Sequence, residues 1–454
     1  MKKSGITFLF LLFGLTVCLF LVAKTTHFFS GAKETKANIV IDPLAAQGPL
    51  IPIWQALAQG GEEKYPFEGI LPEITALKPK YIRIDHIYDF YNVVGKEHNQ
   101  LKFSWEQLDK LVDQILATGA LPFFSLSYMP PAIAKNGEII NQPENWQDWA
   151  EVVHQTIQHY SGKNQKNLSG VIYEVWNEPD LFGGWTMPAG RQEIGGEKDY
   201  RLLYKYAALG ANQVQDANPF KIGGPAITAP YKNWVDGFLD FTSKNNLRID
   251  FYSWHRYSPQ PEKFLEDINK VDTWLFKNAG FSLEKYLTEF GPFSEKSALN
   301  DSSFAAAHFV ATIRQLLQRL DLAFTFEIKG SWGILSQEKE NLPIKAPRYQ
   351  ALEILNRMTG TRISLEGEND WITGFATKEG NKIKIILVNL DFKNQHFEVV
   401  PLKIINLENG NYLYRRISLD KSENVYHKKI IDNILQEEIP LSPNNVLLIE
   451  LEKT

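Results

Sequence analysis

The chain has 454 residues, 44% of them hydrophobic and 13% aromatic, which is enough to fill the core of one large domain and a smaller one. The formal net charge is −5 and no long run of one sign occurs, so a broad basic surface for nucleic acid is not expected. Eleven tryptophans and 18 tyrosines fit ordinary packing, and flat rings with polar tips also suit the apolar faces of sugars.

The first 23 residues have the character of an export signal. Lys2 and Lys3 precede an uncharged apolar run, 6–23, which predicts a signal sequence or a single membrane span. Leu21 would occupy a position where cleavage after Ala23 usually requires a small residue, which favours an uncleaved anchor. The run continues past Cys18, unlike a lipoprotein signal. Since Cys18 is the only cysteine, no intramolecular disulfide is expected. The remainder is predicted to be extracytoplasmic, either membrane-anchored or secreted.

Residues 24–46 are predicted to form a polar stalk and a lead-in strand, after which short apolar runs alternate with segments of helical period. One helix is indicated by a capping box, Ser104 and Gln107, before apolar positions that recur every three or four residues. The eight predicted strands are 51–54, 81–85, 121–127, 171–176, 221–224, 250–255, 285–289 and 323–327.

This alternation predicts a parallel (β/α)8 TIM barrel over residues 47–360. A doubly wound open sheet is the second reading, but no glycine-rich phosphate fingerprint follows the first strand. Residues 361–454 change to short alternating runs, at 371–376, 382–389, 397–400 and 446–451, which predict a smaller antiparallel, sandwich-like β domain. Residues 38–41 could add a strand to it. Packing against the barrel and separate sugar binding are both open roles for this domain.

Two glutamates stand at the ends of predicted strands, where TIM barrels carry their reactive groups. Glu178 follows the fourth strand and Glu289 closes the seventh, so barrel closure brings them to one mouth. Carboxyl groups about 5 to 5.5 Å apart would suit retaining glycoside hydrolysis. Pro179 keeps Glu178 out of the helical region, and Asn177 can bond a sugar hydroxyl beside the reacting carbon.

The motif Trp176-Asn177-Glu178-Pro179 and the ending Thr288-Glu289-Phe290-Gly291 resemble clan A of the glycoside hydrolases. Over residues 47–360 the chain is most similar to glycoside hydrolase family 39, which includes β-xylosidases, α-L-iduronidases and hydrolases of bacterial exopolysaccharides. Further stretches that carry the resemblance lie at 126–131, 222–226, 251–257 and 331–335, and at 345–360. By position, the resemblance implies that Glu178 is the acid/base, Glu289 the nucleophile and Asn177 the contact of the 2-hydroxyl.

Several further residues are candidates for substrate binding. Arg83 matches an arginine that steadies the nucleophile in related barrels, although a structural ion pair with Asp85 or another carboxylate is an equally simple reading. His255 and Tyr257 leave the sixth strand, where they could position Glu289, bind sugar or serve a structural role.

The remaining candidates are less specific. His86, Trp54, Tyr128 and Trp332 could form subsites or simply pack, and Trp185, in the insertion 181–199, could form a pocket wall. Glu174 reads as a buried, paired structural carboxylate. The family that the chain resembles usually has a tryptophan at the end of the eighth strand. Here Phe326 and Glu327 occupy that place and Trp332 follows, so the sequence does not decide which residue forms the floor of the substrate pocket.

Nine scattered histidines without ligand spacing, and no aspartate-rich loop, indicate no metal, and no cofactor is expected. The leading prediction is a retaining glycoside hydrolase that cleaves O-glycosidic bonds of an extracytoplasmic oligo- or polysaccharide, with the N-terminal segment contacting the membrane if it is uncleaved. The alternatives are a non-catalytic carbohydrate-binding surface protein on the same barrel, and a transglycosylase that uses the same two glutamates.

Overall fold

The computed structural model describes residues 36–61, 63–188, 198–279, 283–330, 333–337 and 343–454. The predicted signal or membrane segment, 1–23, lies outside these residues. Within the described ranges, no helix is both long and apolar enough to cross a bilayer.

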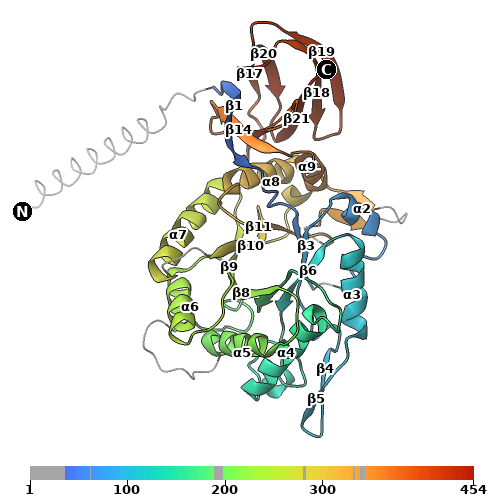
Figure 1. The fold of residues 1–454 in the computed structure, drawn as a ribbon, viewed down its shortest axis with the longest axis vertical. Helices are drawn as coiled ribbons and strands as arrows, with labels where there is room; N and C mark the ends of the chain where they lie inside the picture. The colour runs from blue at the N-terminus through green and yellow to red at the C-terminus, as the bar shows by residue number, and fades with distance from the viewer. Residues whose placement is uncertain (1–35, 62, 189–197, 280–282, 331–332, 338–342) are drawn as a thin grey trace, which may run out of the picture.

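Eight parallel strands close into a barrel in the order β10-β11-β2-β3-β6-β7-β8-β9, which confirms the predicted (β/α)8 architecture (Figure 1). Large side chains from several strands fill the barrel interior, among them Phe123, Phe251 and Phe324. The strands are β2 (Ala56–Gln59), β3 (Tyr81–Ile84), β6 (Leu121–Leu126), β7 (Val171–Val175), β8 (Phe220–Ile227), β9 (Phe251–Tyr257), β10 (Glu284–Gly291) and β11 (Leu322–Phe326).

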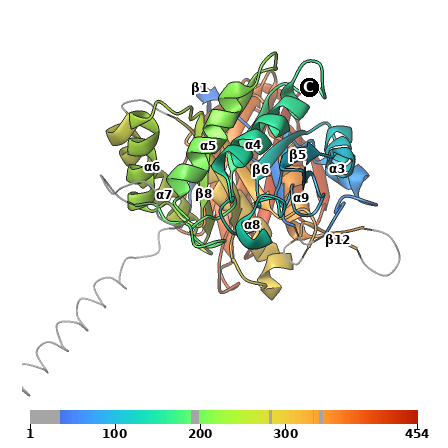
Figure 2. The same ribbon diagram turned by 90° about the horizontal axis from the view of Figure 1, so that it is seen from below.

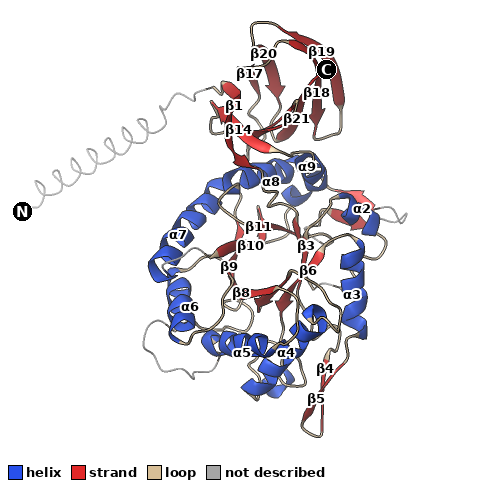
Figure 3. Cartoon of the chain, in the orientation of Figure 1, coloured by secondary structure: helices blue, strands red, loops and turns tan. Residues whose placement is uncertain are grey.

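Helices surround the strands as an outer ring (Figure 3), and α4 and α5 lie side by side along the barrel (Figure 2). Side-chain caps fix the start of both: Asn145 accepts from the Gln147 amide at the start of α4, and Asp199 from the Arg201 amide at the start of α5. The helices are α2 (Leu71–Ala76), α3 (Glu106–Ala117), α4 (Trp146–Ser161), α5 (Tyr200–Gln213), α6 (Lys232–Lys244), α7 (Pro261–Ala279), α8 (Ser303–Leu316) and α9 (Pro347–Leu355), with the short 3-10 turns η1 (Lys135–Gly137) and η2 (Ala298–Asp301). Two hairpins, β4 (Val94–Glu97) with β5 (Gln100–Phe103) and β12 (Leu335–Gln337) with β13 (Pro343–Lys345), extend from the loops.

Two local predictions are wrong. The first barrel strand is not 51–54, because the chain turns there: the Ile53 amide donates to the Ile51 carbonyl and the Gln55 amide to that of Pro52, and the strand begins at Ala56. The capping box also does not form, because the N-cap of α3 is Trp105 and no side chain caps it.

A nine-stranded sheet follows the barrel, in the order β19-β18-β21-β16-β15-β14-β1-β17-β20. Its strands are β1 (Ile39–Pro49), β14 (Thr361–Glu366), β15 (Ile372–Glu379), β16 (Lys382–Asn389), β17 (Glu398–Ile404), β18 (Gly410–Ser418), β19 (Glu423–Ile430), β20 (Leu435–Leu441) and β21 (Asn445–Lys453). The N-terminal strand β1 pairs antiparallel with β14 and parallel with β17, so the predicted extra strand is present. Glu437 of β20 binds Arg416 of β18 and Lys428 of β19, so the two ends of the sheet face each other.

The sheet packs on the barrel through alternate residues of its central strands. On β21, Val446 and Leu448 belong to the large core that includes Phe309 of α8, whereas Leu447 and Ile449 belong to the separate core of the sheet. Arg357, after α9, adds an ion pair with Glu450, 2.8 Å from Nη2 to Oε2. The barrel and the sheet are therefore joined by a hydrophobic interface, to which both contribute buried side chains.

Candidate active site

Both predicted glutamates lie at the C-terminal rim of the barrel, each held by an irregular piece of backbone. Leu287 pairs with Trp254 and Glu289 with His255, which leaves Thr288 as a bulge that turns Glu289 towards the mouth. Glu178 has a φ of 45°, so it lies in the left-handed region instead of the extended conformation usual before proline. Its amide donates to the Ala226 carbonyl on β8 at 3.0 Å, which fixes this unusual position.

The two carboxylates face each other across a short gap. One oxygen of Glu178, one oxygen of Glu289 and a ring nitrogen of His255 all lie within 4.8 Å of one another. His255 Nδ1 lies 2.8 Å from Glu178 Oε1 and 3.6 Å from Glu289 Oε2. The structure therefore brings together three of the predicted site residues from three strands.

Glu289 is the more firmly held of the two. Arg83 donates to its Oε1 at 2.9 Å and Tyr257 to its Oε2 at 2.9 Å, and only 6% of the residue is exposed. Arg83 is fully buried and also donates to Glu174 and Asn177, each at 2.8 Å. Glu174 is thus the paired, buried carboxylate that its place on the strand predicts, and Arg83 forms ion pairs with both Glu174 and Glu289.

The charged groups in this cluster shift one another's pKa values. Burial and the nearby Glu178 raise the pKa of Glu289, against the opposing effects of His255, Arg83 and Tyr257. Burial acts to lower the pKa of His255, but the carboxylates of Glu289 and Glu178 outweigh it and raise that pKa. Burial also raises the pKa of Tyr257 well above its usual value, which keeps its hydroxyl able to donate.

Asn177 is oriented by two neighbours. Its Oδ1 accepts from Arg83, and its Nδ2 donates to the Tyr128 hydroxyl at 3.0 Å. The amide is 4% exposed and lines the same pocket as Glu178. It is therefore placed where a contact with a sugar hydroxyl beside the reacting carbon is feasible.

Glu178, Glu289 and Asn177 line a pocket of about 780 Å³, within the usual range for ligand sites. Of the predicted binding residues, His86, Tyr128, Asn177 and Tyr257 line it, and the His86 ring sits 4.7 Å from that of Tyr128. His86 Nδ1 lies 2.7 Å from Asp89 Oδ2, which fixes the ring.

Two predicted tryptophans, Trp54 and Trp185, are not brought to this pocket. Trp54 precedes β2, at the opposite end of the barrel from the site, where it is 1% exposed and donates to Asn356 Oδ1 at 2.9 Å, so its role is packing. Trp185 is 3% exposed and packs on Trp176 with 5.3 Å between ring centroids, behind the pocket wall. Trp332 lies outside the described residues.

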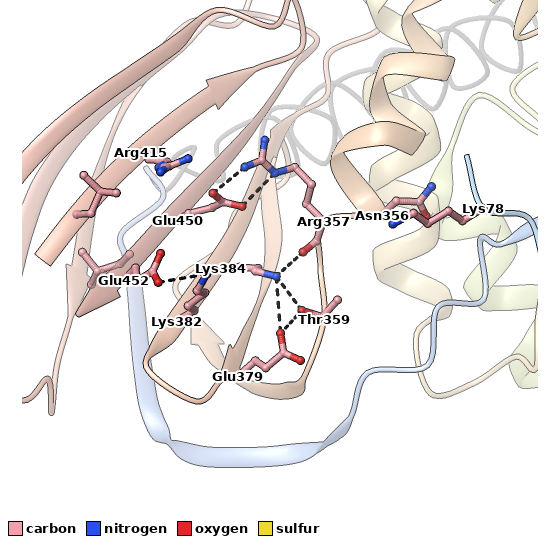
Figure 4. Close-up of a pocket in the computed structure, with 12 residues that line it drawn as sticks. Lys78, Asn356, Arg357, Thr359, Glu379, Lys382, Lys384, Arg415, Glu450 and Glu452 are labelled. Carbon is pink, nitrogen blue, oxygen red and sulfur yellow. Dashed lines mark hydrogen bonds and ion pairs between the residues drawn. The ribbon is translucent and has the colours of Figure 1, made fainter. Parts of the chain in front are cut away.

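A second cavity of about 680 Å³ lies far from the glutamates, between the end of α9 and the sheet (Figure 4). Its charged side chains are largely paired with each other, as Lys382 is with Glu452 at 3.2 Å and Arg357 with Glu450. It carries no arrangement of opposed carboxylates comparable to that at the barrel mouth.

Some residues around the site were not predicted. Asp180 accepts from the amide and hydroxyl of Thr228, tying the loop after β7 to the loop after β8. Ser125 donates to the Trp176 carbonyl at 2.9 Å beneath the site. Short polar side chains such as these give no sequence signal of their own, whether in a loop, as Asp180 is, or in a strand, as Ser125 is.

Glu178, His255 and Glu289 also offer the donor atoms of a metal site. However, Arg83 already places a positive charge on Glu289, and the predicted absence of a metal remains a prediction.

Residues 65–272 match the model of glycosyl hydrolases family 39. A β-xylosidase of Caldicellulosiruptor saccharolyticus is 29% identical over 350 residues, which cover 68% of this chain and 66% of that protein, just under two thirds of its length. A β-xylosidase of Geobacillus stearothermophilus is 23% identical over 425 residues, covering 77% of this chain and 81% of that one.

Solved structures agree on the fold. A monomeric β-xylosidase of Caulobacter crescentus CB15 superposes with a TM-score of 0.76 at 21% identity, covering 92% of this chain and 99% of that one. A GH39 enzyme of Xanthomonas axonopodis pv. citri gives 0.74 at 17% identity, over 93% and 99%. Together with the motifs, these matches confirm the predicted resemblance to glycosyl hydrolases family 39 and support the predicted enzyme class, a glycosidase.

Proposed function

We propose that the protein is a retaining glycoside hydrolase in which Glu289 is the nucleophile and Glu178 the acid/base. The observation that carries the proposal is the approach of the two carboxylates to within 4.8 Å. Retaining enzymes hold their carboxyl groups about 5 to 5.5 Å apart, whereas inverting enzymes need about 6.5 to 9.5 Å to admit water.

The surroundings of each glutamate support its role. Glu289 is buried and fixed by Arg83 and Tyr257, as an attacking carboxylate should be. The Glu178 side chain is more exposed, at 12%, and lies on the opposite strand exit, where a leaving group departs into the open pocket. In the first step Glu178 gives its proton to the glycosidic oxygen while a Glu289 oxygen bonds to the anomeric carbon and the glycosidic bond breaks. In the second step Glu178 takes a proton from water, whose oxygen displaces Glu289 from that carbon.

The proposed substrates are β-xylosides, since the named relatives are β-xylosidases. They would come from an extracytoplasmic oligo- or polysaccharide, with the enzyme exported or membrane-anchored, and the apolar run at 6–23 supports this part of the proposal.

External azide distinguishes the two glutamates. On an aryl β-D-xyloside, Glu289→Gly is expected to lose at least about a thousandfold in turnover, and azide should restore it by forming the α-xylosyl azide. Glu178→Ala should instead give the β-azide, because azide then attacks the intermediate on Glu289. The opposite pattern would exchange the two roles.

NMR of the product released first by the unaltered enzyme tests retention directly. A β-xylose product is expected, and an α product would contradict the double displacement. Lack of hydrolysis across a broad glycan panel, with unchanged sugar affinity in Glu178→Gln, would favour a sugar-binding protein. Products longer than the substrate would show that a sugar takes the place of water.

A further inference from the structure

The pocket around the two glutamates has one polar side and one apolar side. Strands β10, β11, β2 and β3 are neighbours in the barrel, and with the loops that follow them they present Phe326 and several polar groups: Glu289, Asp85, His86 and the backbone of Gly60 and Gly61. On the other side, β6, β7 and β8 are neighbours, and their loops present Asn177, Glu178 and Thr228 together with a group of apolar side chains.

Four of these side chains are large and exposed to solvent. We call Ile140, Leu181, Phe182 and Tyr231 the apolar wall; they are 40%, 60%, 41% and 43% exposed, and all line the pocket. Single exposed apolar residues are common on protein surfaces, but a group that borders one pocket marks a binding surface.

The apolar wall is built onto the loop of Glu178. The amides of Leu181 and Phe182 both donate to the Glu178 carbonyl, at 2.9 and 2.7 Å. Gly183, with a φ of 103°, lets the Ile140 carbonyl approach so closely that an added Cβ would lie 2.6 Å from it. Tyr231 completes the wall beside Thr228, with 3.3 Å between their hydroxyls.

From this placement we propose that the apolar wall is a leaving-group subsite for an apolar aglycone, an alkyl or aryl group. The inference rests on the proposed function, because it takes Glu178 as the acid that protonates the departing oxygen. The group attached to that oxygen must then lie on the Glu178 side of the pocket, against the wall.

A second sugar fits this wall poorly. Its hydroxyls would need hydrogen-bonding partners, but Ile140, Leu181 and Phe182 carry none on their side chains. The one polar group of the wall is the Tyr231 hydroxyl, which lies 3.3 Å from the Thr228 hydroxyl, itself bonded to Asp180. An alkyl or aryl group instead gains from covering the exposed apolar surface.

Alkyl β-D-xylosides from propyl to octyl test the subsite, because the leaving alcohols have nearly constant acidity and differ mainly in apolar area. We expect kcat/KM to rise with chain length, by up to about fourfold per methylene, equivalent to about 0.8 kcal/mol for each buried CH₂. Leu181→Ser should flatten this rise. Leu44→Ser is the matched control, since Leu44 is 68% exposed on β1 of the distant sheet, and it should leave the slope unchanged.

Different outcomes would contradict the apolar subsite and the proposed glycosidase function. Equal kcat/KM along the series in an active enzyme, or a higher value for xylobiose than for octyl xyloside, would overturn the apolar subsite and leave the xylosidase intact. No hydrolysis of any alkyl, aryl or sugar xyloside would overturn the proposed function itself. A slope that persists in Leu181→Ser, Ile140→Ser and the double variant would place the alkyl chain elsewhere and overturn the inference.

Discussion

The charge of Glu289 depends on the few donors that reach it. Burial and the carboxylate of Glu178 both favour its protonated form, yet an attacking carboxylate must be ionised. Arg83 and the Tyr257 hydroxyl act in the opposite direction, each at 2.9 Å from one of its oxygens. His255 favours the ionised form as well, so the nucleophile stays ionised through a few neighbours, and a single substitution can remove the contribution of one of them.

Tyr257→Phe should therefore move the acid limb of the pH profile to higher pH. The Tyr257 hydrogen bond lowers the pKa of Glu289, so its loss lets that pKa rise and a more alkaline medium is needed to ionise the carboxylate. Because hydrogen bonds to charged groups contribute about 1.5 to 3 kcal/mol, kcat/KM should also fall about 10- to 100-fold. The measurement is kcat/KM against pH on an aryl xyloside.

Tyr81→Phe provides the control for this loss of a phenolic hydroxyl. Tyr81 begins β3 at the far end of the barrel, where its hydroxyl donates to the Gly170 carbonyl at 3.2 Å. Its acid limb should coincide with that of the parent enzyme. An unmoved limb in Tyr257→Phe would mean that Tyr257 does not influence the ionisation of Glu289.

At the scale of elements, α8 supports the end of β9 through a buried histidine. His308 is fully buried, and its Nε2 lies 2.7 Å from the carbonyl of Ser258, the residue after β9. Burial lowers the pKa of His308 to about 4, with Arg348 adding to the effect. The histidine is therefore neutral and donates to the carbonyl beside Tyr257.

This histidine should make the fold sensitive to acid. The unfolded chain takes up a proton at His308 below about pH 6.5, whereas the folded chain does so only near pH 4, so stability falls as the pH falls between these values. Since one pKa unit corresponds to about 1.4 kcal/mol, the loss attributable to His308 is about 3 kcal/mol. In His308→Gln, whose amide can still donate, urea unfolding between pH 7 and pH 4 should show a correspondingly smaller loss. Equal losses in both proteins would contradict this assignment.

Individual elements also show where sequence patterns are sufficient to predict the bounds of a strand. Strand β16 has the predicted bounds, 382–389, because an almost continuous apolar run suits a strand buried on both faces. The run 51–54 is equally apolar, but it turns at Pro52, and hydrophobicity alone does not distinguish the two cases. Glu178 and Glu289 could be placed because a strand end in a barrel fixes where a side chain emerges.

Other parts of the site depend on contacts that no short motif encodes. Arg83 meets Glu174, Asn177 and Glu289, which lie 91, 94 and 206 positions away in the sequence. Trp54 and Trp185 were predicted from residue type, which gives no information on direction, and both face packed interiors. The bulge at Thr288 likewise follows from strand pairing.

At the scale of the whole molecule, barrel and sheet should unfold together. Leu448 of β21 is fully buried in the core that contains Phe309 of α8. Leu448→Ala should cost about 2 to 5 kcal/mol and lower the temperature of a single calorimetric transition. Leu44→Ala, at a solvent-exposed position, should change stability by less than about 0.5 kcal/mol. Two separate transitions, with that of the barrel unmoved, would show that the sheet is an independent unit.

The place of β1 has a consequence for synthesis on the ribosome. Its apolar residues Ile39 and Ile41 are covered in the finished molecule by a sheet whose other strands begin at residue 361, and β17, its parallel neighbour, begins at Glu398. The nascent chain must therefore carry this unpaired strand through the synthesis of the entire barrel. During that interval its bare edge is open to chaperones and to mispairing with other chains.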